Sequence, residues 1–413
     1  MAPTPPMAGS PSRSPTVTGD RLSSLPDTPL HTIMSFLPAR QAVQTCVLSW
    51  RWRDLWCSMP CLNIDQREFD TAASPVRRED LERARDRFKK FVDRLLTLHS
   101  ADTLDTLRFH ATGYEFKVVD QWLRRSIKGS PVVVEISLSN HAIFHGLPHY
   151  GSSYCRLKRL RLVSVALGAS LTQQICSDCP VLEDLELESC LLDSSEVASC
   201  TLKSLVIMDC APYYDTNVVV VKAPALTSFH LSLTVVGLKW QGVLVNKMPS
   251  LVKASICFRT GSGTDECSIQ KKPCKLLCSL TNARELELSG SVTLSLLQKR
   301  SDDFPTFYNL RTLLFDGCDS SDTFQILGCF LNNAPMLEKL TLQFCKLPEG
   351  SRKRTRTGTK KPIFFKCDKL TFHCPNLKLT EIKYREDDVQ PLFGLLMGIW
   401  SSLRNTTIVL TKV

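Results

Sequence analysis

The sequence predicts an α/β protein in which a small module of three helices precedes a solenoid of parallel strands with returning helices or loops. Three observations indicate this fold class. One pattern of leucines recurs along most of the chain, while a stretch near the N-terminus has helical periodicity instead. The chain also has 413 residues, of which 43% are hydrophobic, so it can bury a large core.

The stretch CPVLEDLELESC, residues 179 to 190, defines the recurring pattern. Leu185 and Leu187 share one face of a strand, because side chains alternate between the two faces with a period of two. The acidic residues Asp184, Glu186 and Glu188 occupy the other face, and Leu182 and Cys190 flank the strand. One such strand cannot offset the entropy of ordering its own backbone, so the pattern requires stacked copies.

The required copies are present in the sequence. Three segments repeat the full pattern, TLKSLVIMDC, NLRTLLFDGC and MLEKLTLQFC, and they end at Cys210, Cys318 and Cys345. Weaker copies begin at Leu104, Val133, Leu157, Leu226, Leu251, Ala283 and Leu377. Most intervals fall near 20 to 29 residues, and the segments resemble irregular leucine-rich repeats of eukaryotic interaction proteins, with cysteine in the last position. The alternative is an ordinary α/β domain with leucine-rich strands, which the shared register of the four full copies disfavours.

Composition restricts the compartment and the chemistry. Residues 1–19 are rich in Pro, Ser and Thr without an apolar signal region, which predicts a disordered tail and a nuclear and/or cytoplasmic protein that does not enter a membrane. The 18 cysteines are then expected to be reduced and mostly buried. Cys176 and Cys179 form a lone CxxC with no second ligand pair at a matching distance, so no metal site and no cofactor are expected.

Residues 20–65 have helical spacing. Asp27 can cap a first helix, in which Leu30, Ile33, Met34 and Leu37 share a face before Pro38 ends it. A second short helix would carry Ala42, Val43 and Cys46, and a third would place Leu48, Trp52, Leu55 and Trp56 on one face. Because a module of this size cannot bury all these side chains, we expect an apolar surface to remain exposed for a partner.

The segment LPDTPLHTIMSFLPARQAVQTCVLSWRWRDLW in this module resembles an F-box. The resemblance implies that the module binds a Skp-type adaptor and, through it, a cullin of an SCF-type ubiquitin ligase. The residues it assigns to adaptor binding are Leu25, Pro26, Leu30, Ile33, Leu37, Pro38, Val43, Leu48, Trp52, Leu55 and Trp56. Trp50 departs from the family pattern, which usually has Arg or Lys at this position.

The rest of the chain divides by pattern. Residues 66–100 are expected to form a linker and a helix that caps the first repeat, with Leu81, Ala84, Phe88, Phe91, Leu95 and Leu98 at helical spacing. Leucine-rich repeats are expected over 101–350 and a basic loop over 351–361. Residues 362–413 are similar to the FBD-type tail of many plant F-box proteins with leucine-rich repeats, and this resemblance extends over nearly the whole chain.

The basic loop holds six of the cations behind the net charge of +10, namely Arg352, Lys353, Arg354, Arg356, Lys360 and Lys361. Without them the net charge is 10 − 6 = +4. The run is either a solvated loop or a nuclear-import signal. Nucleic-acid binding is not expected, because the run contains no aromatic residue for base stacking.

No phosphate-binding loop, nucleophile elbow or RING-like array of cysteines and histidines occurs in the sequence, so the chain is not expected to be an enzyme. The F-box resemblance instead implies a receptor subunit that holds a protein substrate near a catalytic chain. Two alternatives stay open: a co-receptor of the same architecture that requires a small molecule, and a nuclear scaffold that binds nucleic acid through the basic loop.

The strand alternation also predicts where a substrate binds, because the residues between the core leucines must point away from the core. The predicted contact residues are Arg159, Arg161, Asp184, Glu186, Val206, Met208, His230 and Leu314. Val206, Met208 and Leu314 carry the prediction, since apolar residues surrounded by charge are typical interface anchors. A solvated sheet face whose charges pair with one another is the alternative.

Overall fold

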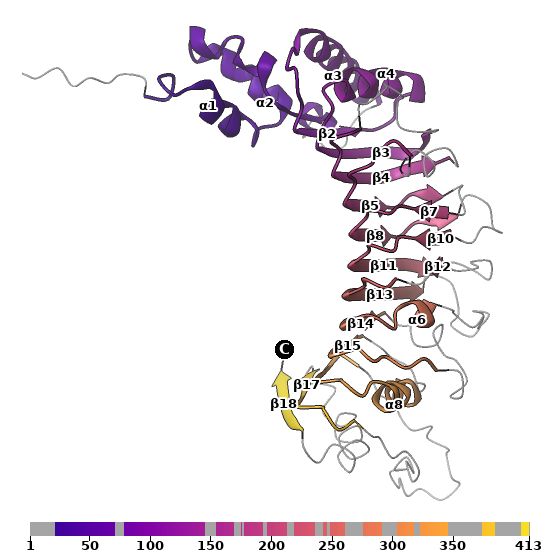
Figure 1. Ribbon diagram of the computed structural model, residues 1–413. Coiled ribbons are helices and arrows are strands. Elements are labelled where there is room, and N and C mark those ends of the chain that lie inside the picture. The colour runs from indigo at the N-terminus through magenta and orange to yellow at the C-terminus, as the bar shows by residue number, and fades with distance from the viewer. Residues whose placement is uncertain are drawn as a thin grey trace, which may run out of the picture.

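The computed structural model describes residues 21–70, 78–144, 154–168, 175, 177–192, 196–212, 219–235, 243–245, 248–260, 276–290, 304–317, 323–345, 374–384 and 406–412. Residues 1–19, the basic loop, Cys176 and Cys318 lie outside these ranges. Figure 1 shows a curved column of stacked strands with a group of helices at its N-terminal end. The predicted α/β fold class, a helical module followed by a solenoid of parallel strands, is confirmed.

The column is one sheet in which every described strand pair is parallel. Its strands follow one another in the order β1-β2-β3-β4-β5-β8-β11-β13-β14-β15-β16-β17-β18. Their bounds are β1 Cys61–Asp65, β2 Thr106–Ala111, β3 Val133–Phe144, β4 Arg159–Leu167, β5 Asp184–Glu188, β8 Ser204–Met208, β11 Ser228–Val235, β13 Lys253–Thr260, β14 Glu285–Ser289, β15 Thr312–Asp316, β16 Lys339–Gln343, β17 Leu379–Tyr384 and β18 Thr407–Lys412. Each repeat therefore adds one strand beside the previous one, as a solenoid requires.

The return segments lie behind this sheet (Figure 1). They contain the helices α4 Phe116–Ile127, α6 Leu276–Ser279 and α8 Thr323–Asn333. A second parallel sheet contains β7 Glu196–Ala198, β10 Val219–Lys222 and β12 Val243–Val245, and the short strands β6 Leu191–Leu192 and β9 Ala211–Pro212 extend the main sheet sideways. Core side chains fill the space between the main sheet and these segments, so the opposite face of the sheet stays open.

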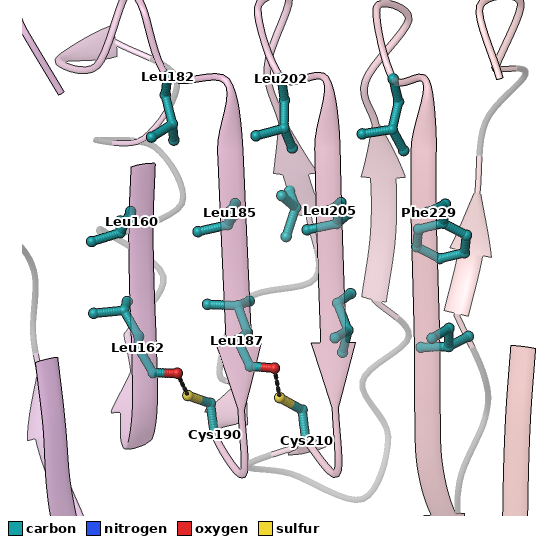
Figure 2. Close-up of a cluster of buried hydrophobic side chains, with 14 of the residues drawn as sticks. Leu160, Leu162, Leu182, Leu185, Leu187, Cys190, Leu202, Leu205, Cys210 and Phe229 are labelled. Carbon is teal, nitrogen blue, oxygen red and sulfur yellow. Dashed lines mark hydrogen bonds between the residues drawn. The ribbon is translucent and has the colours of Figure 1, made fainter. Parts of the chain in front are cut away.

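The core consists of the leucines that define the repeat, stacked in register. Leu160, Leu185, Leu205 and Phe229 align across four neighbouring strands and are at most 1% exposed (Figure 2). One repeat start is corrected. The predicted start at Val133 would pair Arg159 with Glu135, but Arg159 pairs with Val133. This repeat therefore begins at Pro131, and its core residues are Val134 and Ile136.

Several strands end in the same left-handed turn. Ser189, Asp209, Gly290, Gly317 and Phe344 each follow the last strand residue with a positive φ, and each donates its backbone N–H to the carbonyl oxygen of the next strand. The cysteine after this turn then points into the core. Cys190 Sγ lies 3.3 Å from the Leu162 carbonyl oxygen, and Cys210 Sγ lies 3.4 Å from that of Leu187 (Figure 2). Cys190 and Cys210 are thus hydrogen-bonded structural residues.

The N-terminal module contains the first two predicted helices, α1 Asp27–Met34 and α2 Ala39–Gln44. The predicted cap is corrected, because Pro26 and not Asp27 is the N-cap of α1, and Leu37 lies beyond the end of this helix. The third helix was predicted wrongly. Three short 3₁₀ segments take its place, Thr45–Val47, Trp50–Trp52 and Leu55–Ser58. Ser49 has extended backbone (φ −163°, ψ 170°), which prevents α-helical hydrogen bonds from continuing through it.

The helix α3 Arg78–Leu98 caps the first repeats. It buries Ala84, Phe88 and Leu95 as predicted, while Leu81 and Leu98 are exposed. Phe88 packs edge-on against Trp122 of α4 with ring centroids 5.8 Å apart. The cap thus closes the core with aromatic side chains.

The helical module and the solenoid share one core. The first strand of the sheet, β1, directly follows the last 3₁₀ segment and pairs with β2. The Cys57 carbonyl oxygen accepts the backbone N–H of Ser100, and that of Pro60 accepts the N–H of Asp105. One cluster of buried residues extends from Leu30 to Ile382. The sequence analysis did not identify β1 as a repeat strand, although Leu62 and Ile64 fit the pattern.

Candidate protein-binding surfaces

The helical module exposes a group of large apolar side chains, which we call the docking patch. It contains Ile33, Phe36, Val47, Leu48 and Trp50, which are 41%, 82%, 83%, 60% and 84% exposed. Soluble domains bury most side chains of this kind, and contiguous exposed groups mark interaction sites. The predicted apolar surface therefore exists, although several of its residues differ from those expected.

Four residues assigned to adaptor contact lie in the core instead. Leu30, Trp52, Leu55 and Trp56 are 0%, 3%, 7% and 8% exposed, so their side chains stabilise the module and do not face a partner. Of the remaining assigned residues, Leu25, Leu37 and Val43 are partly buried against this core, Pro38 is half-buried, and Pro26, Ile33 and Leu48 are exposed.

Phe36, Val47 and Trp50 are exposed residues of the docking patch that the sequence analysis did not select. Phe36 follows α1 and does not share the face on which Leu30 and Met34 lie, so helical spacing gave no reason to select it. Val47 and Trp50 lie in the 3₁₀ segments. Their exposure depends on tertiary packing, which the sequence pattern does not report.

Polar contacts hold the backbone beneath the docking patch. Trp52 donates its indole N–H to Ser23 Oγ at 2.9 Å, which ties the 3₁₀ segment to the start of the module. Arg51 Nη2 forms an ion pair with Asp27 Oδ1 at 2.5 Å, at the first residue of α1. The guanidinium of Arg53 lies over the Trp50 ring, 5.2 Å from its centroid, so the ring has a cation on one side.

The second surface is the inner face, by which we mean the open face of the main sheet from β2 to β18. The predicted alternation is confirmed here: Arg161, Glu186, Val206 and His230 align in one row across β4, β5, β8 and β11. Further along the same row lie Ser255, Glu287 and Leu314. The eight predicted contact residues therefore occupy one continuous sheet face.

Charges at the N-terminal end of the inner face pair with one another. Arg159 Nη2 lies 3.1 Å from Asp184 Oδ2. Arg161 Nη2 lies 2.7 Å from Glu188 Oε2, and its Nε lies 3.1 Å from Glu186 Oε1, an ion pair whose angle does not make it a hydrogen bond. The hydrogen bond that Arg161 donates to Glu188 is the main cause of the raised pKa of Arg161. Both arginines are thus paired with carboxylates of the same sheet face.

The middle of the inner face has a different composition. From β8 to β13 it carries the uncharged side chains of Val206, Met208, Ser232 and Ser255 beside His230. Arg259 of β13 also lies on it, with its Nη2 3.0 Å from Ser232 Oγ and 3.8 Å from Asp209 Oδ2. Burial lowers the pKa of His230 although Glu287 opposes the shift, which favours the neutral imidazole near pH 7. Val206, Met208 and Leu314 are half-buried, so part of each side chain faces solvent.

Neither a metal centre nor a membrane-spanning helix occurs in the described part of the chain. No group of three His, Cys, Asp or Glu residues there could hold a metal ion. None of the described helices combines the length and the apolar composition needed to cross a bilayer. The described part of the chain presents two candidate surfaces for binding other proteins, the docking patch and the inner face.

Comparison with known proteins finds matches for both the helical module and the solenoid. Residues 22–63 match the F-box domain, and residues 92–252 match the leucine-rich repeats of the FBD-associated F-box protein At5g56370. The chain is 34% identical to the meiotic F-box protein MOF of Oryza sativa subsp. japonica over 394 residues, 88% of this chain and 80% of that protein. It is 29% identical to the putative FBD-associated F-box protein At5g50270 of Arabidopsis thaliana, over 78% of this chain and 81% of that protein.

The chain belongs to this family of plant F-box proteins with FBD-associated leucine-rich repeats. The resemblance seen in the sequence is thereby confirmed. In the FBD-like region, the described strands β17 and β18 continue the parallel sheet, with Leu379 paired to Lys339 and to Thr407.

Proposed function

We propose that this chain is the substrate-recognition subunit of an SCF-type cullin ubiquitin ligase. Its helical module binds a Skp-type adaptor, and its inner face binds a protein substrate. The observation that carries the proposal is the docking patch: five large apolar side chains are exposed on an F-box module whose core is continuous with the solenoid.

Adaptor binding would bury the docking patch. Removing apolar surface from water contributes about 25 cal/mol per Å², so a patch that includes Phe36 and Trp50 can anchor an interface. The core residues Trp52, Leu55 and Trp56 act indirectly, since they hold the backbone that presents Val47, Leu48 and Trp50.

The chain contributes proximity to ubiquitin transfer, and the transfer chemistry belongs to other subunits. Holding a substrate lysine beside a carrier loaded with ubiquitin replaces a bimolecular encounter with an intramolecular one. The effective concentration of the lysine is thereby raised. A rigid connection between the two binding surfaces favours this role, because flexibility between them would lower the effective concentration of the substrate lysine.

Adaptor binding is tested with the purified full chain and a purified plant Skp adaptor. Phe36→Asp with Val47→Asp places two charges in the docking patch and is expected to abolish co-purification of the adaptor. Tyr308→Asp is the matched control, because Tyr308 is also a large exposed side chain, 70% exposed, but lies on the solenoid. Equal adaptor recovery with the patch variant and the control would refute the proposal.

Substrate binding at the inner face is tested with Met208→Asp combined with Leu314→Asp. Both side chains are half-buried on the open side of the sheet, so the fold should tolerate the charges better than at a core position. We expect this variant to bind the adaptor normally and to lose partners captured by the wild-type solenoid. Retention of all those partners would move the substrate site away from the inner face.

A further inference from the structure

The strand β18 is an edge strand of the main sheet in the described part of the chain. There it pairs with β17 alone, in register from Leu379 beside Thr407 to Tyr384 beside Lys412. It lies at the opposite end of the column from the helical module (Figure 1). An edge strand presents unpaired backbone groups to any chain that can add a further strand, so natural sheets usually protect such edges.

The outward backbone groups of this edge belong to Ile408 and Leu410. In a parallel pair, alternate residues of a strand direct both their N–H and C=O groups to the same neighbouring strand. Thr407 donates its N–H to the Lys378 carbonyl oxygen at 2.9 Å, so Thr407 and Val409 face β17. The N–H and C=O groups of Ile408 and Leu410 therefore point away from β17, where no other described strand pairs with them.

The side chains of β18 do not protect its outer edge. Val409 and Leu410 are 41% and 48% exposed, and Ile408 is partly buried against the core. The strand Thr407–Lys412 contains no proline and no acidic residue, and its one charged residue is the last. Sheets that avoid pairing at an edge use charge, proline or a bulge there, so this edge favours the addition of a strand.

A second copy of β18 matches this edge in one antiparallel register. With Val409 placed opposite its own copy, Ile408 of each chain lies opposite Leu410 of the other. Because these are the outward residues, each such pair can exchange two backbone hydrogen bonds. Ile408 and Leu410 also follow the core-face positions of Thr380 and Ile382 on β17, so this register would extend the core face across both chains.

Face and charge both favour this register. A shift of one residue would place core-face side chains opposite open-face ones. In the register centred on Val409, Thr407 lies opposite Thr411 and Lys412 lies opposite Thr406, so no like charges meet. The arrangement has a two-fold axis at the Val409 pair, so one strand sequence supplies both sides of the interface.

We propose that two copies of this chain form a dimer by antiparallel pairing of their β18 strands, with Val409 beside its own copy. The inference is independent of the proposed function, because it uses no residue of the docking patch and neither Met208 nor Leu314. Both docking patches stay accessible, since each lies at the far end of its own column (Figure 1). Because a pair of short strands buries little area, the dimer is weak and depends on protein concentration.

Sedimentation equilibrium of the full chain tests the dimer. We expect the average mass to rise from that of one chain towards twice this value as the concentration increases from about 1 to about 100 µM. Val409→Lys and Val409→Glu each place like charges opposite one another at the axis, so each variant alone should keep the mass of one chain. An equal mixture of the two variants should regain the dimer, because opposite charges then meet.

The matched control is Val252→Lys, because Val252 is 40% exposed, close to the 41% of Val409, but lies before β13 and away from β18. This variant should dimerise like the wild-type chain, and thermal melts show whether each variant folds. A wild-type chain that keeps the mass of one chain at the highest concentration overturns the inference. A dimer that persists in both charge variants, or an equal mixture that keeps the mass of one chain, overturns it as well.

Discussion

Trp50 and Trp52 belong to one 3₁₀ turn, yet one is 84% exposed and the other 3% exposed. Trp52 donates to Ser23 Oγ inside the module, whereas Trp50 forms part of the docking patch. Two tryptophans separated by one residue therefore lie in different environments, and we propose a role in stability for Trp52 and a role in binding for Trp50.

Substitution of each tryptophan should separate these roles. Trp50→Ala is expected to leave the melting temperature nearly unchanged and to weaken adaptor binding by about 2 kcal/mol, as loss of an aromatic interface anchor often does. Trp52→Ala should lower the free energy of unfolding by about 3 to 5 kcal/mol, because it leaves a large cavity. Calorimetry of both binding and unfolding measures the two effects, and a reversed ranking would contradict the assignment.

The repeat register makes a second prediction. Leu185→Ala and Leu340→Ala remove side chains that are 1% and 0% exposed, so each should cost about 2 to 5 kcal/mol of unfolding free energy. Glu186→Ala lies between core leucines but faces the open side of the sheet, and it should cost much less. Denaturant unfolding of the three variants checks the order.

Two glycines at equivalent turns should respond differently to alanine. Both have positive φ, +92° at Gly290 and +60° at Gly317. A Cβ at Gly317 would meet no atom within 4 Å, so Gly317→Ala should cost only about 1 kcal/mol of backbone strain. A Cβ at Gly290 would overlap the backbone carbonyl oxygen of Phe258, so Gly290→Ala should cost clearly more. Similar melting temperatures for the two variants would contradict the turn geometry.

Thiol labelling provides a fourth prediction. Cys200 is exposed, while Cys190 and Cys210 are buried and donate to backbone carbonyls. Burial raises the pKa of Cys374 to about 11, so about 0.1% of it is thiolate at pH 8 and its labelling should accelerate as the pH rises towards 11. Mass spectrometry after brief treatment with iodoacetamide should find Cys200 modified before Cys190 and Cys210. Early modification of Cys190 would show that the core is open.

The basic run gives a fifth prediction, on localisation. We propose that Arg352, Lys353, Arg354 and Arg356 form part of a nuclear-import signal together with Lys360 and Lys361. Replacing the first four by alanine should reduce nuclear accumulation of a fluorescently tagged chain without changing its melting temperature. Unchanged localisation would leave the run as a solvated loop.

Local periodicity predicted most of the repeat architecture. The alternation at Leu185, Glu186 and Leu187 assigns core and open faces correctly, because a strand's period of two depends only on its own residues. The same reasoning failed for the third helix of the module. Apolar spacing there satisfied a helical period, but the extended backbone at Ser49 divides the segment.

The contact surfaces were harder to predict than the core. The family resemblance assigned Trp52 and Trp56 to the interface, yet both belong to the core cluster that the module shares with β1 and α3. Conversely, the exposure of Phe36 and Val47 depends on how α1 and the 3₁₀ segments pack. The ion pairs of Arg161 could be anticipated from neighbouring repeats once their register was known.

The continuous core between the helical module and β1 fixes the distance from the docking patch to each part of the inner face. Each repeat displaces the next by about 4.8 Å, so the number of strands before β8 sets the distance from the docking patch to the middle of the inner face. In the proposed ligase, this fixed distance would determine which lysines of a bound substrate lie close enough to the ubiquitin carrier to be modified. Inserting or deleting one repeat ahead of β8 would therefore change which lysine is modified while every residue that touches the substrate stays the same.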